Sequence, residues 1–416
     1  YMNIILIQIN NKSTESEFEY ISKEIDASKI IYVNSENTYS YNLNKSISLN
    51  SSSYKHYNIN KNIEPFFNYN VDDISLIVYS SGTTGKPKGI IHKFSTLYKN
   101  AQLFNKAVGI TNKNRFLNLL SLTYLGGYYN LLMLPFSANA SIVLYKHFDI
   151  NHLVKLPNLI SEYSINTLWL VPSIVAIMNQ FDRNDRNTLD IYMRYIDLVL
   201  VGTAPLAKHT RDGFENKYKL TLYENYGLSE TLFVSTQSPL YKNNFDSKGK
   251  ILEEIEILLE DDNELVVNTP FRSQGYYTKL KDSENFIEDN IFKTGDIAKV
   301  EDDILFIVDR KKDIIIRGGE NISSVEIENF ILDFQNIIDV AIIGVSHELY
   351  GEDIVAFIVA DLKFNLKELR KYCGKNLNSK KVPSKYIEIE EIPKNKNGKK
   401  DKNKLKNILR SEYEYE

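Results

Sequence analysis

Short apolar segments alternate with helical patterns along most of the chain, and this alternation limits its fold more than any other feature. Between residues 74 and 217, apolar segments of strand length are separated by segments with helical spacing. Strands that alternate with helices predict parallel sheets connected by crossover helices. We therefore expect an α/β fold with layered, mostly parallel sheets. The expected strands are 74–80, 141–145, 167–171 and 198–201, and the expected helices are about 97–108, 152–163 and 210–217.

The first 70 residues begin with the same alternation and then lose it. We expect a strand at residues 4–9, a helix at 15–27 and a strand at 30–33. Residues 34–70 are rich in Asn, Ser, Tyr and Lys without a sustained period, which indicates a loop-rich connection or a weak sheet edge. No catalytic residue is expected there.

The pattern changes after residue 250. Residues 251–267 alternate apolar and charged side chains over short stretches, which predicts a small antiparallel, barrel-like section. A charged run at 309–312 ends this section, and we place a domain boundary at about Arg310. The elements expected beyond it are strands 314–316, 340–345 and 354–359 and helices 324–332 and 365–377.

Length and composition exclude several classes of protein. A chain of 416 residues is long enough for two to three domains of about 150 residues. Its 50 Lys and Arg against 54 Asp and Glu give a net charge of −4, which lacks the basic surface of a nucleic-acid binder. Cys373 is the only cysteine, which excludes a disulfide framework and a cysteine-ligated zinc cluster. With no run of 18 apolar residues and no secretory signal, we expect a cytoplasmic protein without an integral membrane segment.

Residues 79–92 (YSSGTTGKPKGIIH) form a glycine-rich loop directly after an apolar strand. Glycines let the backbone turn tightly toward phosphate oxygens, while hydroxyl groups add donors and lysines add positive charge. The loop is not a Walker A loop, because only two residues separate Gly82 from Gly85 and because Pro87 follows Lys86. By itself the string fits a polyphosphate-binding loop or a solvated β-turn.

This string resembles the AMP-binding signature of adenylate-forming enzymes, the superfamily of acyl-CoA synthetases, peptide-synthetase adenylation domains and firefly luciferase. The resemblance implies ATP as a substrate. It also implies a large domain at residues 1–309, a hinge at 310–313 and a small mobile α+β domain at 314–416. The implied loop residues that bind the nucleotide are Ser80, Ser81, Gly82, Thr83, Thr84, Gly85 and Lys88, with Thr83 also catalytic.

Residues 223–231 (YENYGLSET) are similar to the second nucleotide motif of this family. The resemblance implies that Tyr226 stacks on adenine and that Ser229 offers a hydroxyl group to the α-phosphate. It further implies that Glu230 is catalytic and holds Mg²⁺ through carboxylate oxygen. The other residues implied to contact the nucleotide are Glu224, Asn225 and Gly227, and the strand-end residues Gly202, Thr203 and Ala204.

Two further segments resemble family motifs in the expected order. Residues 292–297 (FKTGDI) imply that Asp296 accepts hydrogen bonds from both ribose hydroxyl groups. Residues 309–328 imply three roles that follow one another along the chain. Arg310 would contact the ribose, Lys312 would be the hinge, and Gly319 would line the tunnel for the thiol arm.

The last motif is at residues 393–402 (PKNKNGKKDK). The resemblance implies that Lys399 bridges the substrate carboxylate and the α-phosphate. In the implied reaction, a carboxylate attacks the α-phosphate of ATP to form acyl-AMP, pyrophosphate leaves, and a thiol then accepts the acyl group. Positioned cations are the main requirement of such a step, and no side-chain nucleophile is needed.

Residues 121–130 (SLTYLGGYYN) indicate the class of carboxylic acid that is activated. Peptide-synthetase adenylation domains carry an aspartate here that pairs with the α-ammonium group of the amino acid, whereas this chain has Leu125. A buried ammonium group would lack a partner, so we expect a fatty or aryl acid as the small-molecule substrate. The implied residues of the acyl pocket are Tyr124, Leu125 and Gly126.

The thiol acceptor is less closely defined by the sequence. Residues 317–322 (RGGENI) favour CoA, whereas Asp401, two residues after Lys399, favours the phosphopantetheine of an acyl carrier protein. We expect CoA, with a carrier-loading enzyme and a non-catalytic nucleotide-binding homologue as alternatives. Only 78 residues precede the glycine-rich loop, fewer than in most relatives of this superfamily. We therefore expect either a naturally short member or a chain that has lost an N-terminal piece.

Overall fold

The computed structural model describes residues 6–8, 20–21, 30–33, 46–49, 70–80, 87–145, 148, 150–182, 185–241, 243–277, 290–394 and 400–413. The chain divides into two compact units. One unit comprises Tyr1–Ser95 and Ser273–Ser283, and the other comprises Thr96–Arg272 and Glu284–Glu416. The predicted boundary at Arg310 falls within the second unit and stays a prediction.

The first unit contains a three-stranded sheet of β1 (Leu6–Gln8), β4 (Ile74–Ser80) and β5 (Lys88–Lys93). β1 runs parallel to β4, and β5 runs antiparallel to it. Residues 88–92, which the sequence analysis assigned to the glycine-rich loop, are therefore in a strand. The reason is a run of apolar β-branched residues after Gly89, of which Ile90 is fully buried. In the same unit, β2 (Ile30–Val33) pairs in parallel with β3 (Ser46–Leu49).

The predicted strand at 4–9 is confirmed for Leu6–Gln8, and the rest of it lies outside the described residues. The predicted helix at 15–27 also lies outside them, apart from residues 20 and 21, which are helical.

Parallel strands form one half of the sheet in the second unit. They are β6 (Arg115–Asn118), β7 (Ser141–Leu144), β8 (Thr167–Leu170), β9 (Leu198–Val201) and β10 (Leu222–Leu228). Each pairing among these strands is parallel, in the order β10, β9, β8, β6, β7, as the alternation of strands and helices predicted. β8 and β9 are buried at every position and apolar apart from Thr167, as expected of parallel strands covered on both faces.

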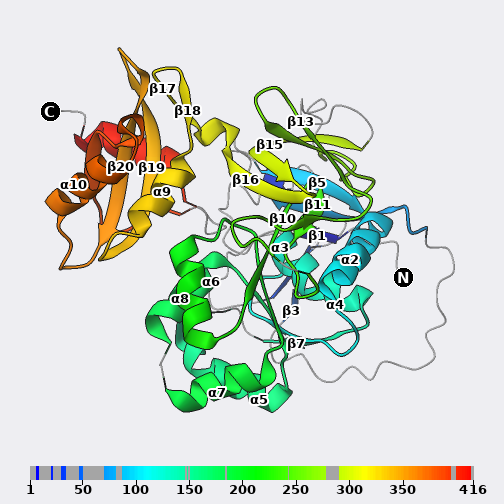
Figure 1. Cartoon of the computed structure of the whole chain (residues 1–416). Coiled ribbons are helices and arrows are strands. Elements are labelled where there is room, and N and C mark those ends of the chain that lie inside the picture. The colour runs from blue at the N-terminus through cyan, green and yellow to red at the C-terminus, as the bar shows by residue number, and fades with distance from the viewer. Residues whose placement is uncertain are drawn as a thin grey trace, which may run out of the picture. The chain divides into compact units, whose positions relative to one another are not determined.

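Helices connect these strands. The predicted helices at 97–108 and 210–217 are confirmed as α2 (Phe94–Val108) and α8 (Lys208–Tyr218). The predicted helix at 152–163 is divided into a 3₁₀ turn, η3 (Ile150–Lys155), and α5 (Leu156–Tyr163), because Pro157 fits the first turn of an α-helix. The sequence analysis missed α6 (Pro172–Phe181) and α7 (Arg186–Tyr195). Figure 1 shows α5 to α8 as one group of green helices.

Antiparallel strands form the other half of the same sheet. They are β11 (Leu232–Thr236), β12 (Lys250–Ile251), β13 (Glu256–Leu259), β14 (Glu264–Asn268), β15 (Ile291–Glu301) and β16 (Ile304–Arg310). The predicted antiparallel section at 251–267 is therefore present. Among the described residues, however, these strands form an open path of eleven strands together with the parallel ones, not a closed barrel, because β13 pairs on one side only.

The C-terminal elements form a second, smaller sheet. The predicted helix at 324–332 is confirmed as α9 (Ser324–Leu332), and the strands predicted near 340 and 354 are the long hairpin of β19 (Ile337–His347) and β20 (Gly351–Ala360). The other elements are β17 (Ile315–Arg317), β18 (Glu320–Ile322), α10 (Leu366–Asn376), β21 (Lys385–Glu388) and α11 (Lys402–Ile408).

Side chains of β19 alternate between two apolar clusters. Val340 and Ile342 pack with α9 and α10, whereas Ala341 and Ile343 pack with Leu405 of α11. This alternation places helices on both faces of the small sheet. Figure 1 shows α9 and α10, in yellow and orange, beside β19 and β20. Within the described residues, no helix is long and apolar enough to cross a membrane.

Candidate active site

The turn between β10 and β11 carries the predicted Mg²⁺ ligand. A β-carbon on Gly227 would lie 2.1 Å from the Leu232 carbonyl oxygen, so only glycine permits the close approach of the two strands. Ser229 and Glu230 follow Gly227 and are half-buried in the turn. A hydroxyl group next to a carboxylate gives hard oxygen donors of the kind that Mg²⁺ prefers, so the residues of this turn fit the predicted metal.

Three predicted nucleotide residues from distant segments contact one another. The Tyr226 hydroxyl donates a hydrogen bond of 2.5 Å to Asp296 Oδ2, and Arg310 Nε lies 2.5 Å from Asp296 Oδ1. The β15–β16 pairing places Asp296 directly opposite Arg310. Asp296 is 2% exposed, and both of its oxygens have partners. Burial and the Asp296 carboxylate raise the pKa of Tyr226 well above its usual value, so the phenol stays a donor.

The ends of β9 and β10 bring a second group of predicted residues together. The two strands are parallel, so residues after their carboxyl ends meet at one edge of the sheet. Asn225 Nδ2 donates to the Val201 carbonyl oxygen at 2.9 Å, and a β-carbon on Gly202 would lie 2.5 Å from Asn225 Oδ1. Gly202 is therefore needed where the Asn225 amide crosses the strand end. Thr203 follows with a φ of +71°, and Ala204 is half-buried.

The predicted acyl-pocket residues lie next to Thr203. A β-carbon on Gly126 would lie 2.6 Å from a ring carbon of Tyr124 and 2.9 Å from the Thr203 methyl carbon. Leu125, the first residue of the short helix α3 (Leu125–Tyr128), is 8% exposed. Burial raises the pKa of Tyr124 to about 12, so its phenol is neutral at physiological pH. Tyr124, Gly126 and Thr203 thus form one close-packed wall without an acidic residue among them.

Glu224, a predicted nucleotide residue, is buried between two cations. It is 5% exposed, and its carboxylate forms ion pairs with Arg211 through Oε1 and with Lys248 through Oε2. Its backbone N–H donates to Gln237 Oε1 at 2.9 Å. These contacts hold β10 in the sheet. Both carboxylate oxygens of Glu224 are already in ion pairs, and its nucleotide contact stays a prediction. Sequence reasoning missed Arg211 and Lys248, because no local pattern links them to Glu224.

The structure describes only the two ends of the glycine-rich loop. Ser80 closes β4 and lies opposite Lys88, the first residue of β5, so the loop connects two antiparallel strands. The Lys88 ammonium group lies 5.0 Å from the centre of the Tyr276 ring. The predicted residues outside the described part of the chain are Ser81, Gly82, Thr83, Thr84, Gly85 and Lys399.

The predicted hinge and thiol tunnel lie on exposed backbone. Lys312 is exposed in a 3₁₀ turn, η4 (Lys311–Asp313), and its neighbour Lys311 lies 2.6 Å from both Asp262 and Glu264. Gly319 has a φ of +79°, and a β-carbon there would have no neighbour within 4 Å. Glycine is favoured at this position by its backbone conformation.

Asp309, the residue before the hinge, contacts the start of α9. Its Oδ2 accepts hydrogen bonds from the hydroxyl groups of Ser323 (3.0 Å) and Ser324 (2.9 Å) and from the Val325 N–H (3.2 Å). These groups include a backbone donor that the first turn of a helix leaves without an intrahelical partner. Asp309 of β16 therefore caps a helix that follows the predicted domain boundary.

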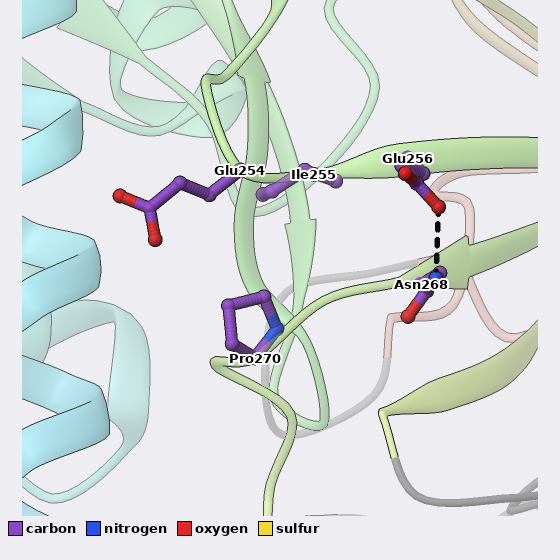
Figure 2. A pocket seen from close by; sticks show the side chains of 5 residues that line it. All are labelled: Glu254, Ile255, Glu256, Asn268 and Pro270. Carbon is purple, nitrogen blue, oxygen red and sulfur yellow. Dashed lines mark hydrogen bonds between the residues drawn. The ribbon is translucent and has the colours of Figure 1, made fainter.

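One hollow and one acidic group elsewhere in the described part of the chain contain none of the predicted site residues. A hollow of about 350 Å³ lies on the β13–β14 ribbon, where Asn268 donates to Glu256 at 2.9 Å (Figure 2). Glu260, Asp262 and Glu264 place carboxylate oxygens within 4.8 Å of one another, but Lys293 and Lys311 pair with them. Each of these three carboxylates already has a lysine partner.

Solved structures with this fold define the class of protein. ATP-bound MatB from Rhodopseudomonas palustris aligns with a TM-score of 0.85 over 98% of this chain and 84% of its own, at 22% identity. The o-succinylbenzoate CoA synthetase from Bacillus subtilis, in complex with its acyl-adenylate intermediate, aligns with a TM-score of 0.79 over 96% of this chain and 82% of its own, at 23% identity. The fold is thus that of adenylate-forming ligases.

Sequence comparison gives the family directly. The model of the AMP-binding enzyme family matches residues 1–277, and that of the AMP-binding enzyme C-terminal domain matches residues 326–399. The chain belongs to the AMP-binding enzyme family. The relatives include a 2-succinylbenzoate–CoA ligase from Listeria monocytogenes, 31% identical over 79% of this chain and 69% of the relative. A 2-succinylbenzoate–CoA ligase from Staphylococcus epidermidis is 28% identical over 82% of this chain and 71% of the relative.

These findings confirm the resemblance seen in the motifs. The protein is an AMP-forming acid–thiol ligase, which activates a carboxylic acid with ATP as acyl-AMP and transfers the acyl group to CoA. Its cosubstrates are ATP and CoA. The o-succinylbenzoate CoA synthetase from Bacillus subtilis has also been solved in complex with ATP and magnesium ion, at 23% identity to this chain.

Proposed function

We propose that the acid activated by this enzyme is an aryl acid of the 2-succinylbenzoate kind. The observation that carries the proposal is the 31% identity to a 2-succinylbenzoate–CoA ligase over 79% of the chain. The wall formed by Tyr124, Gly126 and Thr203 supports it, because glycine next to a neutral aromatic side chain leaves an apolar surface that suits a flat ring.

Each motif residue would have its own role in the reaction. Asp296 and Arg310 would hold the ribose, and Tyr226 would contact adenine. Lys399 and the hydroxyl group of Thr83 would stabilise the negative charge that grows as a carboxylate oxygen bonds to the α-phosphorus and pyrophosphate leaves. Mg²⁺ at Glu230 would neutralise phosphate charge. In the second half-reaction the CoA sulfur would attack the acyl carbon, and AMP would leave.

A second candidate acid is malonate. A malonate–CoA ligase from Arabidopsis thaliana is 26% identical over 82% of this chain and 62% of the relative. Malonate and 2-succinylbenzoate share one property, since each keeps a second carboxylate after the first is activated. The two acids differ in size, so a substrate panel distinguishes them.

The test is acid-dependent exchange of pyrophosphate into ATP with 2-succinylbenzoate, malonate, benzoate, octanoate and phenylalanine. We expect the strongest exchange with 2-succinylbenzoate. Exchange with malonate alone would support the second candidate, and exchange with phenylalanine alone would contradict both. CoA and a phosphopantetheinylated carrier protein are then compared as acceptors, and thioester formation on the carrier alone would contradict CoA as the acceptor.

Lys399→Ala tests the residue assignment. We expect exchange to fall about 100- to 1,000-fold, the usual cost of removing one stabilising donor from a transition state. Lys404→Ala, an exposed lysine of α11, is the matched control and should keep the parent rate. Equal rates for the two variants would exclude the proposed role of Lys399.

The hinge is proposed at Lys312, at an exposed position of η4. Proline fixes φ near −65° and removes a backbone donor, so Lys312→Pro should slow thioester formation more than pyrophosphate exchange. Unchanged thioester formation would contradict this assignment.

A further inference from the structure

Glu328 is a buried carboxylate on α9 that holds two lysines of the last motif. It is 8% exposed, its Oε2 lies 2.9 Å from Lys400 Nζ, and its Oε1 lies 3.5 Å from Lys402 Nζ. Oε1 also accepts the Ile342 N–H of β19 at 3.0 Å. Glu328 therefore links a helix and a strand of the small sheet to the chain on both sides of Asp401.

Asp339, on β19, adds a second carboxylate at the same place. Its Oδ1 lies 3.2 Å from Lys400 Nζ, and its Oδ2 lies 4.0 Å from Lys394 Nζ. Lys400 also donates to the Val340 carbonyl oxygen. Burial lowers the pKa of Lys400, but the carboxylates of Glu328 and Asp339 outweigh this effect and leave the pKa above its usual value. Lys400 is therefore a charged anchor.

Two of these lysines, Lys394 and Lys400, join the two ends of a short segment of the chain. Lys394 and Lys400 form an antiparallel bridge, and the Asp401 N–H donates to the Pro393 carbonyl oxygen at 2.8 Å. Residues 395–399 connect these two points. Their ends are thus joined to each other, and the two carboxylates attach the joint to α9 and β19.

Lys399 is bonded directly to Lys400, and consecutive α-carbons are about 3.8 Å apart. An anchor on Lys400 therefore limits where the α-carbon of Lys399 can lie. A misplacement of about 1 Å in a reacting group can cost about 100-fold in rate, so an anchor one residue away has a kinetic consequence.

We propose that Glu328 and Asp339 are positioning residues for adenylation, which act by anchoring Lys400 and so placing Lys399. The proposal rests on the function proposed above for Lys399. It assigns no contact with substrate to either carboxylate. The proposal predicts a loss of rate in the first half-reaction only, because Lys399 is needed for the attack on ATP and not for the attack by the thiol.

The test compares Glu328→Gln and Asp339→Asn with Glu326→Gln. Glu326 is the matched control because it lies on the same helix and pairs with Lys381, at 2.5 Å, on an exposed face. Exchange with 2-succinylbenzoate, or with the acid most active in the panel above, should fall about 10- to 100-fold in Glu328→Gln and stay at the parent rate in Glu326→Gln. Thioester formation from the synthetic adenylate of that acid and CoA should keep its rate in all three variants.

A second comparison separates positioning from a general structural role. In a Lys399→Ala background, Glu328→Gln should cause no further loss of exchange, because the residue through which it acts is absent. An additional loss in that background, or equal loss in both half-reactions, would overturn the proposal. If Glu328→Gln does not fold, the less buried Asp339→Asn decides the question by the same two criteria.

The outcomes also separate this proposal from the proposed function. An inactive Lys399→Ala variant combined with a fully active Glu328→Gln variant would overturn the positioning role alone. A fully active Lys399→Ala variant would overturn the assignment of Lys399 itself.

Discussion

The Tyr226 hydroxyl donates a 2.5 Å hydrogen bond to Asp296 Oδ2, although the two residues are 70 positions apart in the chain. This bond joins β10 to the β15–β16 hairpin. It therefore connects two motifs that the sequence presents as separate.

Tyr226→Phe removes this hydrogen bond and keeps the aromatic ring. A hydrogen bond to a charged group contributes about 1.5–3 kcal/mol, so the free energy of unfolding should fall by about that amount. The KM for ATP should rise, because Asp296 is also the proposed ribose acceptor. Urea unfolding and steady-state kinetics measure the two effects, and an unchanged unfolding midpoint would contradict the first.

Glu224→Gln removes a buried charge between two cations. Arg211 would keep only its longer pair with Glu215 (3.5 Å), and Lys248 would lose the carboxylate of Glu224. We therefore expect a loss toward the lower end of about 3–5 kcal/mol in the free energy of unfolding. Glu253→Gln is the control, since the ion pair of Glu253 with Lys106 is about two-thirds exposed, at 68% for each side chain. An exposed pair contributes about 1 kcal/mol or less. Similar losses in both variants would disprove the structural role of Glu224.

Gly126→Ala places a methyl group against Tyr124 and Thr203, at distances that force one of them to move. We expect the KM for the acid to rise and the preference among acids to change, while the KM for ATP stays constant. Gly374→Ala, in α10, is the control because nothing lies within 4 Å of the added carbon. The control should stabilise its helix by about 1 kcal/mol or less. A KM for the acid equal to that of the control would argue against Gly126 in the pocket.

Gly319→Ala tests the predicted thiol tunnel. Gly318 and Gly319 both have positive φ, at +59° and +79°, so alanine at either position costs about 1–2 kcal/mol of backbone strain. Only Gly319→Ala should slow thioester formation from a synthetic adenylate, and pyrophosphate exchange should persist in both variants. Equal thioester rates in the two variants would count against Gly319 as the tunnel residue.

Alkaline pH should unfold the protein through its buried tyrosines. Burial raises the pKa values of Tyr129, Tyr192 and Tyr226 well above the unfolded value of about 10. Below pH 10 both states keep these protons, and above it the unfolded state loses them first, so the free energy of unfolding falls as pH rises. Urea titrations between pH 8 and 11, with tyrosinate absorbance, measure this fall. Reversible ionisation of all tyrosines without loss of structure would refute it.

Local patterns predicted the parallel half of the large sheet well. Apart from Thr167, residues 167–171 and 198–201 are apolar runs between helical patterns, and such runs suit strands that are buried on both faces. The same reasoning missed β15, where polar Thr294 and Asp296 occupy buried positions. A buried polar residue reverses the pattern from which a strand is recognised, so site strands are the hardest to predict.

The candidate site was predicted residue by residue but not as an arrangement. Motif resemblance named Tyr226, Asp296 and Arg310, whereas their mutual contacts depend on the register of β15 and β16. The partners of Glu224 and Glu328 could not be predicted, because an ion pair between distant segments leaves no local signal in a sequence.

The cap that Asp309 places on α9 limits how this protein can be divided in engineering. A chimera joined between residues 309 and 310 would take the aspartate from one parent and the helix that it caps from the other. The parent that supplies residue 309 would then need an acceptor at this position for the grafted helix to keep its first turn bonded. A junction upstream of β16 keeps Asp309 together with Ser323 and Ser324, and it is the better place to exchange C-terminal regions among members of this family.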